Sequence, residues 1–146
     1  MSQYDWIIQG GRVIDPANGI DAELDLAISD GEIARVDRGL DAAAADRVYA
    51  AAGELVVPGL IDLHAHCHDR ATAVGVDIDH YGLGRGVTTA VDAGSAGSDT
   101  FDGFRALAVE RFRTRVLALL NISRVGMSVA HADDGRELAQ LEHPEF

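Results

Sequence analysis

Residues 58–66 decide the fold, and they read Pro58-Gly59-Leu60-Ile61-Asp62-Leu63-His64-Ala65-His66. An apolar run ends there in two histidines that are separated by one residue. In an extended strand, side chains at positions i and i+2 point to the same face of the sheet. His64 and His66 can therefore reach one metal ion through neutral imidazole nitrogens, which suit zinc and its neighbours. The stretch predicts a strand that ends in a pair of metal ligands.

The sequence after this strand alternates between strand and helix patterns, which predicts parallel strands joined by crossover helices. We expect a short helix at 77–84, a strand at 87–92, and a helix from about residue 98 or 100 to Arg113. A third strand is expected at 115–123. Its nearly continuous apolar residues predict burial on both faces.

The first 57 residues predict a small unit of short antiparallel strands. Gly10-Gly11 is expected to form a turn that interrupts the first strand. Alternating side chains at 24–29 indicate a half-buried strand, and Asp30-Gly31 predicts a type I′ hairpin turn after it. Such a unit is too small to be stable alone.

The two blocks together do not make a closed structure. A (β/α)₈ barrel needs roughly 250 residues, and this chain has 146. A three-stranded parallel sheet would leave exposed edges, which proteins normally cover. The architecture therefore predicts the N-terminal part of something larger.

Composition disfavours two classes of partner. The formal net charge is −12 and the pI is about 4.6, which disfavours nucleic acid and membrane surfaces as partners. The chain lacks a basic start followed by a long apolar region, and its single cysteine excludes an internal disulfide, so a cytoplasmic location is predicted. All twelve basic residues are arginine, so a metal site that needs a lysine-derived ligand cannot be completed within this chain.

Several ordered segments resemble the opening of amidohydrolase-superfamily metal-dependent hydrolases. The general match rests on Gly11-Arg12-Val13-Ile14-Asp15-Pro16, Ile28-Ser29-Asp30-Gly31-Glu32-Ile33, the 58–66 motif and Gly86-Val87-Thr88-Thr89. Similarity to the deacetylase-like branch, beside the dihydroorotase-like one, rests on Val91-Asp92-Ala93-Gly94-Ser95-Ala96-Gly97, Phe101-Asp102-Gly103-Phe104-Arg105 and Leu119-Leu120-Asn121-Ile122-Ser123. The resemblance extends from about Tyr4 to Gly126.

This resemblance implies an α/β protein with two parts. Residues 1–57 would be a β-sandwich segment, and residues 58–146 would be the first three β/α units of a TIM-type (β/α)₈ barrel, incomplete in this chain. His64 and His66 would lie at the C-terminal end of the first barrel strand, the end where such barrels place their active sites. They would hold the more buried of one or two divalent metal ions, with zinc favoured. The remaining ligands and the catalytic aspartate would come from later strands, so no catalytic residue is assigned within this chain.

The implied reaction is hydrolysis of a small-molecule amide or ester by a metal-activated hydroxide. Dihydroorotase-like enzymes carry an arginine two residues after the second histidine, where this chain has His68. The departure favours N-acyl or deacetylase-type chemistry over cyclic amide hydrolysis of the dihydroorotase or hydantoinase kind. If strand geometry continued, His68 would share the face of His64 and His66. It could then contact the substrate or support the ligands, or it could simply be a loop residue. Asp92, at the end of the second strand, could line the site or make structural hydrogen bonds.

Several residues also have interpretations that give them no role in a functional site. Alternation places Cys67 on the opposite face, where a small core thiol is favoured over a thiolate ligand. His80, His131 and His143 are predicted to face solvent. At the level of function, the alternatives are an inactive truncated remnant and one half of a split enzyme. The sequence leaves open a homo-oligomer or a complementing second chain as partner.

Overall fold

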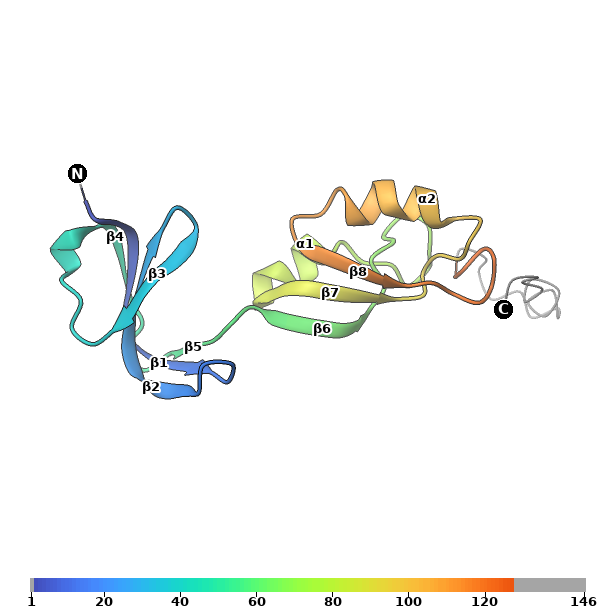
Figure 1. Cartoon of the computed structure of the whole chain (residues 1–146). Coiled ribbons are helices and arrows are strands. Elements are labelled where there is room, and N and C mark those ends of the chain that lie inside the picture. Colours follow the sequence, from blue (N-terminus) through green and yellow to red (C-terminus); the bar gives the residue numbers. More distant parts are fainter. Residues whose placement is uncertain (1, 128–146) are drawn as a thin grey trace. The chain divides into compact units, whose positions relative to one another are not determined.

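The computed structural model describes residues 2–127, which divide into two compact units between Pro58 and Gly59 (Figure 1). Each unit has its own sheet and is described by itself. The predicted solvent-facing His131 and His143 lie outside the described residues. Strands, parallel pairing and short helices together make this an α/β protein, as the sequence predicts. The β-sandwich and the incomplete barrel stay predictions.

The first unit is a five-stranded sheet built around its first strand. Its elements are β1 (Tyr4–Asp15), β2 (Ile20–Ser29), β3 (Glu32–Asp37), the 3₁₀ turn η1 (Ala42–Ala44), β4 (Ala45–Ala50) and β5 (Leu55–Val56). The strand order is β3-β2-β1-β4, and β5 also pairs with β1. The first three strands are antiparallel, whereas β4 and β5 run parallel to β1. The prediction of an all-antiparallel unit is therefore wrong: the chain crosses from β3 at one edge to the far side of β1 instead of turning back in a hairpin.

Two turns are expected at glycines of this unit, and the structure confirms one of them. Gly10-Gly11 is not a turn, because β1 continues through it with a register shift between Ile8 and Gly11. Gly10 has a φ of 72°, which is typical of a glycine-containing bulge. By contrast, Asp30 and Gly31 have φ values of 53° and 79°, so the positive φ pair of a type I′ turn is confirmed.

A buried carboxylate ties this bulge to the core of the unit. Asp25 accepts hydrogen bonds from the backbone N–H groups of Gly10 at 2.7 Å and Leu40 at 2.9 Å. Leu40 packs with Ile7 and Ala27 in the buried cluster. Burial of Asp25 and Ala27 beside Leu26 also breaks the alternation expected at 24–29, because both faces of β2 are covered there.

The second unit is a parallel sheet in the order β6-β7-β8, and Figure 1 shows α2 lying over it. Its elements are β6 (Leu60–Ala65), α1 (Ile78–Tyr81), the 3₁₀ turn η2 (Leu83–Arg85), β7 (Val87–Ala93), α2 (Phe101–Phe104), the π-helical turn η3 (Arg105–Val109) and β8 (Arg115–Leu119). The predicted strand–helix alternation is confirmed. The helices are shorter than expected, since the helix predicted to reach Arg113 ends as a π turn at Val109.

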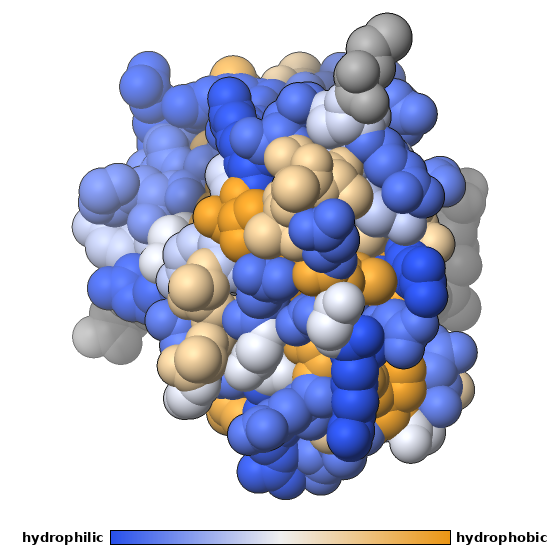
Figure 2. All heavy atoms as spheres, turned by 90° about the vertical axis from the view of Figure 1, so that its left-hand side faces the viewer, coloured by the Kyte–Doolittle hydropathy of each residue, from blue (hydrophilic) through white to orange (hydrophobic). Residues whose placement is uncertain are grey.

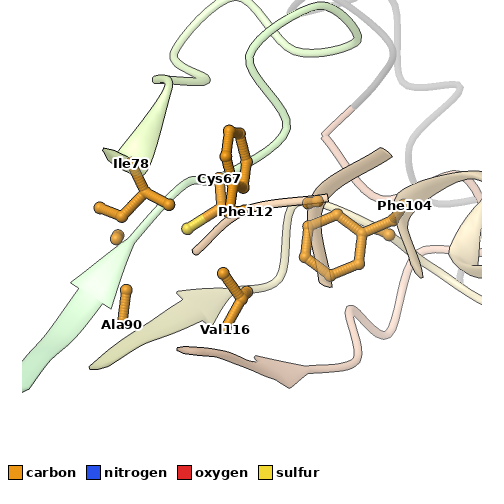
Figure 3. Close-up of a cluster of buried hydrophobic side chains, with 9 residues drawn as sticks. Cys67, Ile78, Ala90, Phe104, Phe112 and Val116 are labelled. Atoms are coloured by element: carbon orange, nitrogen blue, oxygen red, sulfur yellow. The ribbon is translucent and has the colours of Figure 1, made fainter. Parts of the chain in front are cut away.

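Side chains from every layer of this unit meet in one apolar cluster (Figure 3). The figure labels Cys67, Ile78, Ala90, Phe104, Phe112 and Val116, all of them buried. Among residues 2–127, side chains cover only one face of the sheet in this way. On β8, Val116 is 6% exposed, whereas Leu117 and Leu119 are 44% and 61% exposed. The prediction that this strand is buried on both faces is wrong within residues 2–127, because the described helices cover only the Val116 side.

The surface view in Figure 2 shows a largely hydrophilic face. Figure 2 shows one face of the molecule on which hydrophilic residues predominate and hydrophobic residues gather in smaller patches. Across the described part of the chain, no helix has the length and apolar character needed to cross a bilayer.

Candidate metal centre

His64 and His66 lie where β6 ends, at the same end of the sheet as the loop after β7. His64 is the penultimate residue of the strand, and His66 follows its last residue, Ala65. The ring centroids are 5.5 Å apart and the rings are nearly perpendicular, at 83°. His64 is exposed and His66 is half-buried. Both line a cavity of about 350 Å³, together with Asp62.

Hydrogen bonds to their backbone groups hold the two histidines in place. The His64 N–H donates to the Asp62 carboxylate at 3.0 Å, two residues earlier on the strand. The carbonyl of His66 accepts the N–H of Val76 at 2.8 Å, so the segment that leads into α1 returns beside the strand end. The cavity is bounded on that side by Val74, Val76 and Ile78.

Ser95 is a neighbour of His66 that the sequence reasoning did not single out. Its hydroxyl lies 3.2 Å from His66 Nδ1, and the serine is fully buried. It belongs to the small-residue loop at 94–97. Because the carboxyl ends of parallel strands share one edge of a sheet, a polar residue just after β7 was the available signal.

Asp92 makes structural hydrogen bonds, one of the two roles expected for it. It is 1% exposed, and its two carboxylate oxygens accept the backbone N–H of Cys67 at 2.6 Å and of Ser95 at 2.7 Å. It therefore joins the residue after His66 to the residue that contacts His66. A supporting role for Asp92 in a metal or substrate site stays a prediction.

His68 does not continue the face of His64 and His66, so that geometric expectation is wrong. The strand ends at Ala65, residues 66–68 have no regular secondary structure, and His68 is not among the residues that line the cavity with His64 and His66. His68 is 5% exposed, and its ring meets Phe104 of the apolar cluster edge-on, with centroids 5.4 Å apart. Its Nδ1 atom is buried and has no hydrogen-bond partner within residues 2–127. A substrate contact or support of the ligands by His68 stays a prediction.

Cys67 is a core thiol, as alternation predicts. It is fully buried in the apolar cluster. Burial, followed by the negative charges of Asp92 and Asp62, raises the pKa of the thiol to about 12. The group is therefore a neutral thiol at physiological pH, and a thiolate ligand is disfavoured. His80, on α1, is exposed as predicted.

The imidazole nitrogens of His64 and His66 can supply part of a metal-binding site. Two imidazoles on one cavity wall are the ligand type that zinc prefers, but a zinc ion takes about four ligands. Within residues 2–127, no group of three or more His, Cys, Asp or Glu side chains is arranged to hold a metal ion. His64 and His66 thus suit two positions of a coordination shell, and the described residues do not supply the others.

The chain is similar to part of several larger proteins, although no protein-family model matches it. A deacetylase of Agrobacterium fabrum (strain C58) is 42% identical over 98 residues, which cover 67% of this chain and 24% of that protein. The crystal structure of a dihydroorotase matches with a TM-score of 0.75 and 35% identity, over 85% of this chain and 32% of that one.

A zinc-containing structure is also similar. It is the N-acyl-D-glutamate deacylase of Bordetella bronchiseptica, in complex with zinc and a phosphonate inhibitor that mimics the tetrahedral intermediate. The match has a TM-score of 0.59 and 25% identity, and it covers 84% of this chain and 30% of that one. The chain thus spans about a quarter to a third of the length of these relatives.

Proposed function

Because this chain belongs to the amidohydrolase superfamily and matches the N-terminal portion of its members, we propose that it supplies metal ligands to a metal-dependent hydrolase of C–N bonds. The observation that carries the proposal is the pair His64 and His66 on one cavity wall at the end of β6. The metal implied by the relatives is divalent, and zinc suits two imidazole donors.

In this proposal the chain's own residues bind and orient. His64 and His66 would hold the ion through ring nitrogens, and Asp92 would keep the ends of β6 and β7 together behind them. When bound, such an ion lowers the pKa of water and polarises the carbonyl that is attacked. The described residues contain no assigned proton shuttle, so the proposal gives this chain a binding role only.

The substrate class that we propose is an N-acyl amide of the deacetylase type, or a related ester. The similarity to a deacetylase over two thirds of the chain supports it. The buried His68 also supports it, because the position offers no exposed arginine to a substrate carboxylate. Cyclic amide hydrolysis is the second candidate, and the similarity to the dihydroorotase structure favours it.

Zinc retention tests the ligand assignment. The 146-residue chain would be loaded with zinc and desalted, and its metal content compared with that of the His64→Ala/His66→Ala double variant. We expect about one equivalent in the parent chain and a clear loss in the variant. His80→Ala, which removes an exposed histidine from α1, is the matched control and should retain zinc. Equal zinc content in all three proteins would contradict the assignment.

Hydrolysis by the isolated chain is a separate question. We expect no turnover of N-acetyl amino acids, simple esters or dihydroorotate, because two imidazoles leave the coordination shell incomplete. Metal-dependent turnover that disappears in His64→Ala would show instead that the 146 residues are sufficient.

A further inference from the structure

The ring of His66 is held from one side by the hydroxyl of Ser95. His66 Nδ1 lies 3.2 Å from Ser95 Oγ, and among residues 2–127 this is the only hydrogen bond of the ring. Ser95 is fully buried, whereas His66 is half-buried and lines the cavity. The contact engages Nδ1 on the protein side, which leaves Nε2 as the ring nitrogen available to a ligand.

Ser95 is itself fixed through its backbone. Its N–H donates to Asp92 Oδ1 at 2.7 Å, and its carbonyl accepts the N–H of Met127 at 3.0 Å. Gly94, just before it, has a φ of 89°, a conformation that residues with a side chain rarely adopt. The hydroxyl is therefore held at a defined position beside the end of β6.

We propose that Ser95 is a positioning residue that orients His66, so that Nε2 and not Nδ1 meets a bound cation. The inference rests on the proposed function in one respect, the use of His66 as a metal ligand. Partners of this kind fix the ring orientation and the tautomer of metal-binding histidines, and their loss typically lowers metal affinity by 10- to 100-fold.

The direction of this hydrogen bond differs between the two states of the ring. Among the described residues, His66 Nδ1 is the hydrogen-bond partner of the buried Ser95 hydroxyl, and the roles of the two groups depend on the tautomer of the ring. In the metal-free protein we expect Ser95 to donate to Nδ1, with the ring proton at Nε2. If Nε2 is to bind a cation, the ring would carry its proton at Nδ1 instead, with the Nε2 proton released to solvent and one taken up at Nδ1. Ser95 Oγ then accepts. A hydroxyl can serve both states because it is both donor and acceptor.

Nitrogen NMR of the ¹⁵N-histidine-labelled chain tests the inference at a pH of about 8.5. Without metal, we expect the Nε2–H tautomer for His66. After addition of Zn²⁺, we expect an Nδ1–H that is protected from solvent exchange by Ser95. Ser95→Ala should shift the metal-free Nδ1 resonance, remove the protection and weaken zinc affinity by roughly 10- to 100-fold.

Ser98→Ala is the matched control, because it removes an exposed hydroxyl a few residues further along the chain. It should change neither the His66 resonances nor zinc affinity. Coordination through Nδ1, or a Ser95→Ala protein with unchanged His66 signals and affinity, would overturn the inference. If wild-type chain does not bind zinc, the proposed function fails. The metal-free Nδ1 shift then decides separately whether Ser95 holds the ring.

Discussion

Asp92 accepts the backbone N–H of Cys67 at 2.6 Å, which fastens the end of β7 to the residue that directly follows His66. The other oxygen of the same carboxylate accepts the N–H of Ser95. One buried side chain thus sets the spacing between two strand ends. Both contacts are hydrogen bonds from backbone N–H groups to the carboxylate. Asp92 therefore holds the main chain after β6 and after β7, on both sides of the candidate site.

Replacement of Asp92 by Asn should destabilise the second unit. An amide offers one carbonyl oxygen, and its NH₂ group would face a backbone N–H that needs an acceptor. We expect Asp92→Asn to lower the free energy of unfolding by about 1–3 kcal/mol, measured by urea denaturation. Asp102→Asn changes an exposed carboxylate on α2 and should have a much smaller effect. Equal stability of the two variants would contradict the role of Asp92.

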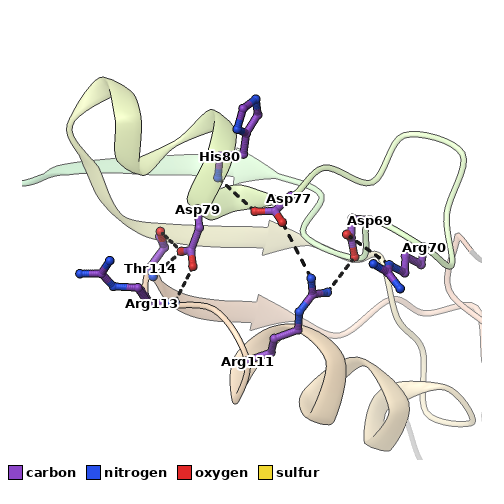
Figure 4. A network of polar contacts seen from close by, with 8 residues as sticks. All are labelled: Asp69, Arg70, Asp77, Asp79, His80, Arg111, Arg113 and Thr114. Atoms are coloured by element: carbon purple, nitrogen blue, oxygen red, sulfur yellow. Dashed lines mark hydrogen bonds and ion pairs between the residues drawn. The ribbon is translucent and has the colours of Figure 1, made fainter.

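Asp79 makes a second such connection, between α1 and the start of β8 (Figure 4). It accepts the backbone N–H groups of Arg113 at 2.9 Å and Thr114 at 2.8 Å, and also the Thr114 hydroxyl at 2.8 Å. Burial alone would raise the pKa of Asp79. The three hydrogen bonds and the charge of Arg113 outweigh it, and the pKa lies below its ordinary value.

Asp79 should therefore stabilise the fold in a pH-dependent way. A lowered pKa in the folded state adds stability above the unfolded-state value of about 3.9, and this stability is lost as the pH falls through the folded-state value. Asp79→Ala should lower the free energy of unfolding by roughly 1–3 kcal/mol at pH 7. In urea titrations from pH 7 down to about 3, the difference from wild type should shrink at the acid end. A difference that is constant with pH would contradict this account.

Cys67 should resist alkylation in the folded chain. Its thiol is fully buried and its pKa is raised to about 12 from the ordinary value of 9.0, so very little thiolate exists at pH 8. Iodoacetamide labelling, followed by mass spectrometry, should be slower by roughly two to three orders of magnitude than in the chain unfolded by urea, since the thiolate is the nucleophile. Equally fast labelling in both conditions would place Cys67 outside the core.

A chimera would test the ligand pair within a complete enzyme. The matched segment of this chain would replace its counterpart in the Agrobacterium deacetylase, and acetate release from N-acetyl substrates would be measured. The chimera should be active. His64→Ala and His66→Ala should each reduce activity by more than the 10- to 100-fold typical of an outer ligand partner.

The control for this chimera is His80→Ala, which should keep its activity. An active chimera that tolerates loss of both His64 and His66 would refute the assignment, whereas an inactive parent chimera would show that the segment does not complete that enzyme.

The sequence predicts the elements of the second unit well, because its signals are local. Apolar runs, glycines and the residues at helix starts lie within a few positions of the structure that they determine. Gly86, for example, follows η2 with a φ of 85° just before β7 begins. The HxH spacing likewise predicts two side chains on one side of the strand end, and both line one cavity.

What the sequence misses depends on partners far along the chain. The parallel pairing of β4 with β1 follows from a crossover that no turn motif marks. The position of His68 depends on where β6 ends and on Phe104, which lies 36 residues later and meets its ring. The Ser95 contact with His66 spans 29 residues. The periodicity of a sequence describes one helix or strand at a time. It therefore does not predict contacts between residues that are far apart in the chain.

The position of β1 in its sheet also affects the order in which the strands can pair during translation. β1 can form its hairpin with β2 soon after both have emerged, but its other edge waits for residues 45–56, which pair with it in parallel. At synthesis rates of about 5–20 residues per second, that wait lasts on the order of seconds. Throughout it, the backbone donors and acceptors on one side of β1 remain open to other nascent chains. β1 precedes its sheet partners in the chain, yet its pairing is completed only when β5 has been made, so its open edge needs protection during translation.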